Sequence, residues 1–213
     1  ASYRRQRQMC IRDRNKPFLL LTSLCLFFNS LSLLTKAEQV VISEIMYHPK
    51  DGGHEFVEIE NLTSTPFDIA LWRLSGGVDF EFPDFSTASP RNTFLKAFEK
   101  IVICDTDPGT FRAAYGLPSA VRVFGPWEGN LNNGGERVNL KDKNGINRCT
   151  VRYDNQGNWP VAADGGGHSL VLFDNNRAID DYRLWKASST INGTPGSSEP
   201  AAAEEPFANP EVD

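Results

Sequence analysis

Cysteine is scarce in this chain. The 213 residues include four cysteines, and only Cys104 and Cys149 lie beyond residue 37. Two cysteines cannot build the disulfide framework that stabilises many small secreted domains. A single disulfide is allowed, but both residues lie in apolar, strand-like runs, and this placement favours buried free thiols.

Positive charge is also scarce once the N-terminal residues are set aside. Residues 1–37 hold seven of the 22 Lys and Arg residues and one of the 27 Asp and Glu residues, so the rest of the chain has 15 basic and 26 acidic residues and a net charge of −11. Nucleic-acid binding depends on basic residues that neutralise backbone phosphates. The composition therefore predicts no nucleic-acid partner.

Recognisable catalytic signatures are missing as well. The glycine-rich segment Asp164–Ser169 lacks the Lys-Ser/Thr pair of a phosphate-binding loop and the Gly-x-Ser-x-Gly of a hydrolase elbow, so we interpret it as a turn. His48, His54 and His168 have a spacing that matches no zinc signature. We therefore predict that this chain is not an enzyme.

Long apolar runs are absent except near the N-terminus. Residues 1–14 have no apolar periodicity and resemble translated sequencing-adapter read-through, so we interpret them as a non-native leader. Residues 15–37 place Lys16 before an apolar run at 18–34 and end in Ala37, which is the order of a secretory signal peptide. A membrane anchor is the alternative, because the run approaches the length that spans a bilayer. We expect a secreted or cell-envelope protein, with no membrane contact after signal removal.

From residue 38 onward, short apolar runs recur at intervals of about ten residues between Gly, Asn, Asp and Pro, which is typical of an all-β sandwich. No helical period continues beyond a couple of turns. The strands are expected at 40–46, 56–60, 67–74, 80–82, 98–104, 121–124, 136–141, 146–153 and 169–173.

Three local signals refine this expectation. One short helix is predicted at 108–115, because Asp107 can cap it, Pro108 suits its first turn and Gly116 can end it. The dipeptide Asn144-Gly145 predicts a type I′ hairpin that joins the strands on either side of it. In 56–60, strict alternation predicts one apolar face and one solvated face.

The segment 38–198 is therefore predicted to form one domain. Residues 199–213 are rich in Pro, Ala and acidic residues, a composition typical of a linker.

Several sequences in this domain occur in a family-specific order. They are VVISEIMYHP, HEFVEIENLTSTPFDIALWRLSGG, LNNGGERVNLKDKNGI, HSLVLF and NGTPGS. Together they resemble a bacterial lamin-tail domain over residues 40–198. The resemblance implies an immunoglobulin-like β-sandwich that serves as a non-catalytic interaction or scaffold module in an exported or cell-surface multidomain protein. Alternatives are a calcium-dependent adhesion or carbohydrate-binding domain, and the accessory domain of a kinase-like or nuclease enzyme encoded downstream.

Four glutamates form a candidate metal-binding site. Glu44, Glu55, Glu58 and Glu60 lie on two neighbouring strands or just before them, and their oxygens would suit Ca²⁺ if the strands bring them together. The alternative is that these acids lie on a solvated face, and that Glu44 pairs with a backbone group or an arginine.

Two tryptophans are candidates for partner contacts. Trp127 and Trp159 each stand beside a proline in an expected loop. Exposed loop aromatics often anchor interfaces, so these two are predicted to contact a protein or a cell-surface glycan.

Overall fold

The structure is a computed structural model that describes residues 39–84, 93–174 and 179–200. The expected leader at 1–14, the expected signal peptide at 15–37 and residues 201–213 of the expected linker lie outside the described residues.

Within the described ranges, the secondary structure is dominated by β-strands. The strands are β1 (Val40–Met46), β2 (Phe56–Asn61), β3 (Phe67–Asp68), β4 (Arg73–Ser75), β5 (Val78–Glu81), β6 (Phe94–Leu95), β7 (Lys100–Cys104), β8 (Arg122–Phe124), β9 (Glu128–Gly129), β10 (Gly135–Lys141), β11 (Asn147–Asp154), β12 (Leu170–Leu172) and β13 (Trp185–Ala187). The helices are α1 (Pro108–Tyr115) and the short 3₁₀ helices η1 (Lys50–Gly52), η2 (Val161–Ala163) and η3 (Tyr182–Leu184).

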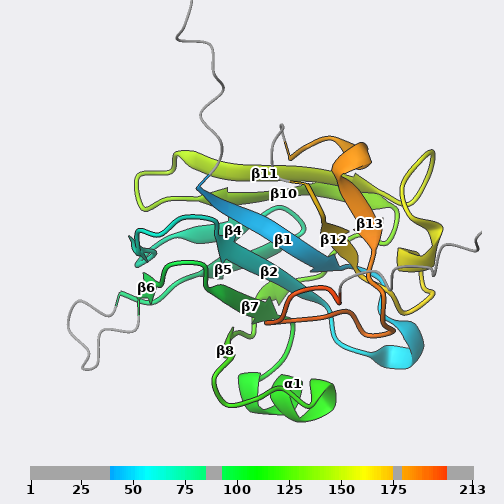
Figure 1. Ribbon diagram of the computed structural model, residues 1–213, viewed down its shortest axis with the longest axis horizontal. Helices are drawn as coiled ribbons and strands as arrows, with labels where there is room; N and C mark the ends of the chain where they lie inside the picture. The colour runs from blue at the N-terminus through cyan, green and yellow to red at the C-terminus, as the bar shows by residue number, and fades with distance from the viewer. Residues whose placement is uncertain (1–38, 85–92, 175–178, 201–213) are drawn as a thin grey trace, which may run out of the picture. The chain divides into compact units, whose positions relative to one another are not determined.

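The strands form two large sheets and one small one. A six-stranded sheet has the order β13-β12-β1-β2-β7-β8, a five-stranded sheet has the order β11-β10-β4-β5-β9, and β3 pairs with β6 (Figure 1). The pairs are antiparallel except β7 with β8, which are parallel and are joined by α1. The predicted all-β sandwich with one short helix is confirmed.

The core lies between the two large sheets. Ile42, Val57 and Ile103 of the six-stranded sheet and Leu140 of the five-stranded sheet have no exposed surface and belong to one cluster of buried side chains. Alternate residues of each strand face this layer because the side-chain period of a strand is two. The alternation seen in the sequence therefore identified the inner faces correctly.

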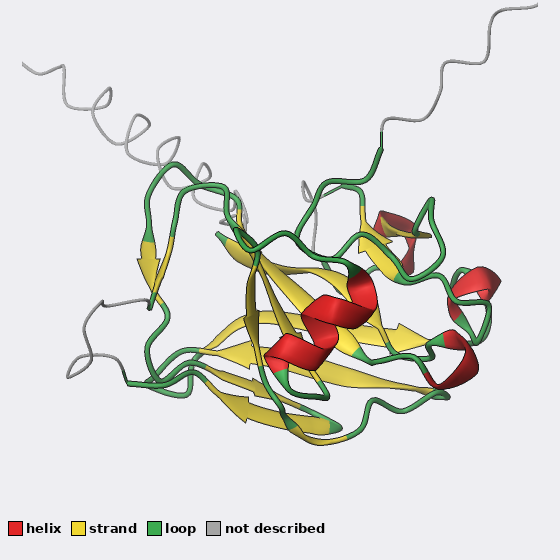
Figure 2. Ribbon diagram, turned by 90° about the horizontal axis from the view of Figure 1, so that it is seen from below, coloured by secondary structure: helices red, strands yellow, loops and turns green. Residues whose placement is uncertain are grey.

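The outer face of the six-stranded sheet is covered, although the alternation in β2 predicted that this face is solvated. A second cluster joins Met46, Phe56, Val102 and Cys104 of the sheet to Phe111 of α1. Figure 2 shows α1 in front of these strands. The predicted solvated face of β2 is therefore wrong: Phe56 and Glu58 both have no exposed surface.

The helix α1 begins and ends where its sequence predicts. The Asp107 carboxylate accepts hydrogen bonds from the backbone N–H groups of Gly109 and Thr110, at 2.9 and 3.1 Å. Gly116 follows the last turn with a φ of 62°, a conformation that glycine adopts without strain.

The β10–β11 hairpin forms as predicted, but its turn is of a different type. A type I′ turn needs a positive φ at both central residues, and only Gly145, with a φ of 78°, has one. The Asp142 carboxylate accepts hydrogen bonds from the N–H groups of Asn144 and Ile146, at 2.9 and 3.0 Å. This side chain therefore stabilises an alternative turn, and the strand register shifts between Leu140 and Lys141.

The predicted continuous strand at 67–74 is interrupted. The Trp72 N–H donates to the Ile69 carbonyl at 3.1 Å, which turns the chain between β3 and β4. Leu71 lies in this turn with a φ of 60° and 39% of its surface exposed, so this residue of the predicted strand is not part of the core.

Among the described residues, Cys104 and Cys149 are both buried and form no disulfide. Within the described part of the chain, no helix is long and apolar enough to cross a membrane.

Candidate functional site

Glu44 and Glu58 form a buried pair of carboxyl groups. They lie opposite each other on β1 and β2, and their residues are 1% and 0% exposed. The register of the pair shifts between Ile42 and Glu44, and the Ser43 hydroxyl also reaches this group, donating to Glu58 Oε1 at 2.6 Å. The bulge thus brings two successive β1 side chains to Glu58.

The segment 188–199, which we call the closing segment, covers the two carboxyl groups. The Thr194 N–H donates to Glu44 Oε1 at 2.8 Å, and the Gly196 N–H donates to Glu58 Oε2 at 2.7 Å. Gly193 has a φ of 71°, and a Cβ at this position would lie 2.3 Å from Glu44 Oε1. Only glycine allows the closing segment to approach Glu44 so closely.

The remaining hydrogen-bonding capacity of the pair is largely used by side chains. The Ser169 hydroxyl donates to Glu44 Oε1 at 2.5 Å, and Lys100 Nζ lies 2.7 Å from Glu58 Oε1. The glutamates therefore hold the chain's own C-terminal part against the sheet.

Burial determines how this pair ionises. Burial, followed by the negative charge of Glu58, raises the pKa of Glu44 to about 8, although the hydrogen bond from Ser169 acts in the opposite direction. Burial also raises the pKa of Glu58, while Lys100 acts to lower it. Burial alone would lower the pKa of Lys100, but the adjacent Glu58 reverses this and the net shift is upward. A pKa of about 8 favours the protonated form of Glu44 at neutral pH, and the 2.7 Å contact between Glu58 and Lys100 Nζ has the geometry of an ion pair.

Of the other two predicted metal ligands, one lies beside this pair and one lies apart from it. Glu60 follows Glu58 by two residues on β2, and Lys100 Nζ, which contacts Glu58, is 3.7 Å from Glu60 Oε2. Glu55 precedes β2 and accepts a hydrogen bond from the Leu131 N–H at 2.9 Å, and burial, followed by Asp105 and Glu136, raises its pKa to about 7. The structure thus brings Glu44 and Glu58 together, links Glu60 to Glu58 through Lys100 and places Glu55 apart.

Among the described residues, no group of three or more His, Cys, Asp and Glu side chains is arranged so that it could hold a metal ion. His48 and His54 each face a separate carboxylate instead, at 2.8 Å from Asp164 and 3.0 Å from Asp105.

The two predicted contact tryptophans differ in exposure. Trp127 is 5% exposed and packs in the main core, with its backbone N–H donating to the Cys104 carbonyl at 3.1 Å, so the expectation that it is exposed is wrong. This backbone bond holds the loop against β7. Trp159 is half-buried with its ring centroid 6.4 Å from that of Trp185, and its role in partner binding stays a prediction.

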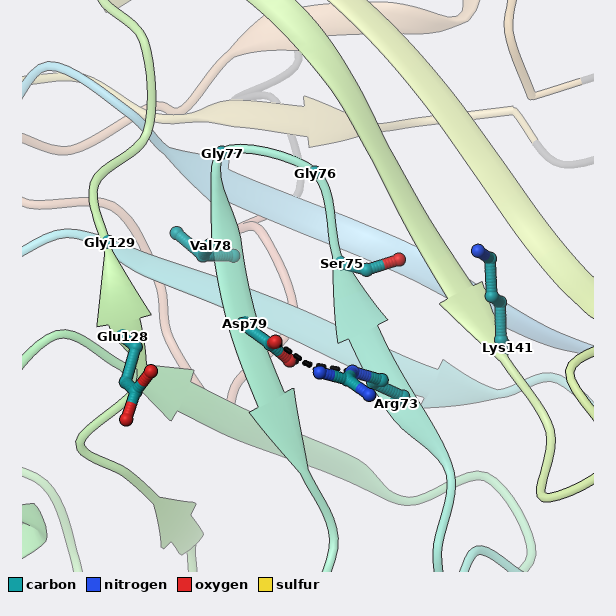
Figure 3. Close-up of a pocket in the computed structure, with 9 residues that line it drawn as sticks. All are labelled: Arg73, Ser75, Gly76, Gly77, Val78, Asp79, Glu128, Gly129 and Lys141. Carbon is teal, nitrogen blue, oxygen red and sulfur yellow. Dashed lines mark hydrogen bonds and ion pairs between the residues drawn. The ribbon is translucent and has the colours of Figure 1, made fainter.

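The outer face of the five-stranded sheet carries a second candidate site. A hollow of about 500 Å³ lies over the β4–β5 hairpin (Figure 3). Arg73 and Asp79 form an ion pair across this hairpin, with Arg73 Nε 2.7 Å from Asp79 Oδ1. Lys141 lies on one side of the pair and Glu128 on the other.

Basic side chains on this face are placed by strand register. Arg137 of β10 lies opposite Arg152 of β11, and Lys141 lies opposite Arg73. Between these two basic pairs, the uncharged Asn139 lies opposite both Thr150 and Ser75. A further hollow of about 420 Å³ is lined by Arg137 and Arg152 and also by the acidic residues Glu136 and Asp154. The register thus places positive charge at both ends of an uncharged polar row.

The two packed sheets define the class of this protein as an immunoglobulin-like β-sandwich, a fold that typically forms non-catalytic modules. The model of the Lamin Tail Domain family matches residues 35–155, which is more than half of the chain. This chain therefore belongs to the Lamin Tail Domain family, as its sequence resemblance indicated. No curated protein matches it.

The sequence placed NGTPGS inside the domain, but neither its contacts with the two glutamates nor the basic pairs were predicted. The contacts have no local signal, because they join backbone N–H groups of Thr194 and Gly196 to side chains far away in the chain. The Arg137–Arg152 pair did have a signal: a hairpin centred on Asn144-Gly145 brings these two positions opposite each other.

Proposed function

We propose that this chain is a non-catalytic interaction module of an exported or cell-surface bacterial multidomain protein, and that it binds its partner through the outer face of the five-stranded sheet. The family supports the modular role, and the order of residues 15–37 supports export.

One observation carries the choice of face. The outer face of the six-stranded sheet is occupied by α1 and by the closing segment. The outer face of the five-stranded sheet has two hollows and carries exposed charged side chains, among them Arg137 and Arg152. A face of this kind can contact a partner without any change in the fold.

The contacts of Glu44 and Glu58 argue against the alternative of calcium-dependent adhesion. Glu44 and Glu58 already accept hydrogen bonds from Thr194, Gly196 and Ser169, and Glu58 has Lys100 as its counter-ion. A calcium ion would have to displace these groups from both carboxyl groups, so the arrangement supports a structural role for the pair.

Two measurements test the proposal. The first fuses residues 1–37 to a reporter that is active only outside the cytoplasm, and export predicts reporter activity. The second mixes the purified full chain with bacterial cell-envelope fragments and measures how much protein sediments with them. A chain that is retained in the cytoplasm and does not sediment with envelope material would contradict the proposed function.

A further inference from the structure

Arg137 and Arg152 form an unusual pair of like charges. They lie directly opposite each other on β10 and β11, and both are exposed. Within the described part of the chain, neither guanidinium group has an ion pair or a hydrogen bond. Asp180 lies close to Arg152, but its carboxylate accepts a hydrogen bond from the backbone N–H of Arg152, at 2.5 Å, and not from the guanidinium group. Like charges directly opposite each other destabilise a sheet, so this pair does not serve the stability of the fold.

Lys141 adds a third basic group on the same face. It lies opposite Arg73, whose charge is balanced by Asp79, whereas Lys141 itself has no ion pair among the residues that the structure describes. Lys141 follows Arg137 on β10 by four residues, a separation of about 14 Å at the rise of an antiparallel strand. A single small anion could not contact both ends of this arrangement.

The surface between these basic groups is polar and uncharged. The Thr150 hydroxyl donates to Asn139 Oδ1 at 3.1 Å, and both residues are partly exposed. Side chains of these two kinds can donate to and accept from the hydroxyl groups of a sugar.

We propose that this face binds an acidic polysaccharide. Carboxylates of the polymer pair with Arg137 and Arg152 at one end and with Lys141 at the other, while sugar hydroxyls contact the row that contains Asn139 and Thr150. Arginine suits this role because its planar guanidinium group matches the geometry of a carboxylate. This inference rests on the proposed function and names the chemistry of its partner.

Other polyanions fit the face less well. A single-stranded nucleic acid gains much of its affinity from bases that stack on aromatic side chains, and the basic pairs and the polar row between them contain no aromatic side chain. An acidic peptide binds most readily by adding a strand to a sheet edge, whereas the basic groups lie on the face.

The test measures the affinity of the full chain for polygalacturonate by titration calorimetry, with dextran as the neutral polymer. We expect binding to polygalacturonate that weakens as salt is added, and no binding to dextran. The double variant R137E/R152E should bind at least about tenfold more weakly, because it replaces both arginines that pair with carboxylates. The variant K96E is the matched control, since Lys96 is exposed and follows β6 of the separate two-stranded sheet.

Several results would overturn the inference. They are an absence of polygalacturonate binding, an equal loss of affinity in K96E, and an equal or higher affinity for poly-glutamate or single-stranded DNA. Sedimentation of R137E/R152E with envelope fragments separates the two proposals. If this variant sediments as well as the unaltered chain, the polysaccharide inference fails while the interaction function stands.

Discussion

Glu44 and Thr194 are 150 residues apart in the chain, and the backbone N–H of Thr194 donates a hydrogen bond to the buried Glu44 carboxyl group at 2.8 Å. With the matching bond from Gly196 to Glu58, this contact makes the closing segment part of the domain.

Because Gly193 lies so close to Glu44, we expect that adding even a methyl group at position 193 strongly destabilises the fold. G193A would place a Cβ 2.3 Å from Glu44 Oε1 and 2.8 Å from Ser169 Oγ at a φ of 71°. We expect the free energy of unfolding to fall by about 2–4 kcal/mol, from backbone strain and the displaced hydrogen bonds. Urea denaturation measures this change.

The matched control for G193A is G145A. Gly145 has a similar φ of 78°, but a Cβ there would meet nothing within 4 Å, so this variant measures backbone strain alone. Equal destabilisation by the two substitutions would show that the closing segment does not press on Glu44.

The raised pKa of Glu44 predicts a stability that falls as the pH rises. The folded state holds the Glu44 proton up to a pKa of about 8, whereas the unfolded chain loses it near 4.5. The contribution is therefore fully present below pH 4.5 and is lost progressively as the pH rises through about 8, with a slope of at most about 1.4 kcal/mol per pH unit.

Glu55 contributes in the same direction between about pH 4.5 and 7, because its pKa is also raised. We expect E44Q to flatten the stability profile over the whole range from pH 5 to 8, including pH 7 to 8, whereas E55Q should flatten it only below about pH 7. Denaturant titrations from pH 5 to 8 measure both profiles. An unchanged slope in E44Q would show that Glu44 is already ionised in the folded protein.

The Glu58–Lys100 pair predicts a strong asymmetry between single and double substitutions. Lys100 Nζ lies 2.7 Å from a carboxylate that has no exposed surface, so K100M leaves a buried charge without its counter-ion. We expect K100M to destabilise the fold by about 3 kcal/mol. E58Q/K100M should recover much of this loss, because the uncompensated charge is removed, and a double-mutant cycle measures the coupling. Additive effects would contradict this assignment.

The like-charge pair predicts a variant that gains stability. R152E places an opposite charge directly across from Arg137 in the register of β10 and β11, and we expect it to raise the free energy of unfolding by about 0.2–1 kcal/mol. K96E, with the same change of charge outside the five-stranded sheet, should show no such gain. Thermal and urea unfolding of the two variants measure the difference, and a loss of stability in R152E would mean that Arg152 has a favourable partner.

Much of the fold could be predicted because its signals are local. Alternation identified Val57 and Ile59 as the inner face of β2, and Asp107, Pro108 and Gly116 identified both ends of α1. The hairpin between β10 and β11 was also visible, although Asp142 changed its turn type by a hydrogen bond that composition does not reveal.

The candidate sites were harder to predict, because their environments come from distant segments. The sequence of β2 alone predicts that Glu58 is solvated. Glu58 is buried because Gly196 and Lys100, which are 138 and 42 residues away in the chain, contact its carboxyl group. Trp127 reads as an exposed loop residue, yet its backbone bond to Cys104 draws it into the core.

The sequence by itself determined the alternation of the strands, the ends of α1 and the hairpin that places Arg137 opposite Arg152, because each depends on residues close together in the chain. Only the tertiary structure decided which outer sheet face is covered by other segments and which is not. Coverage depends on which distant segment has donors that match a buried carboxyl group, and here the backbone N–H groups of Thr194 and Gly196 meet Glu44 and Glu58.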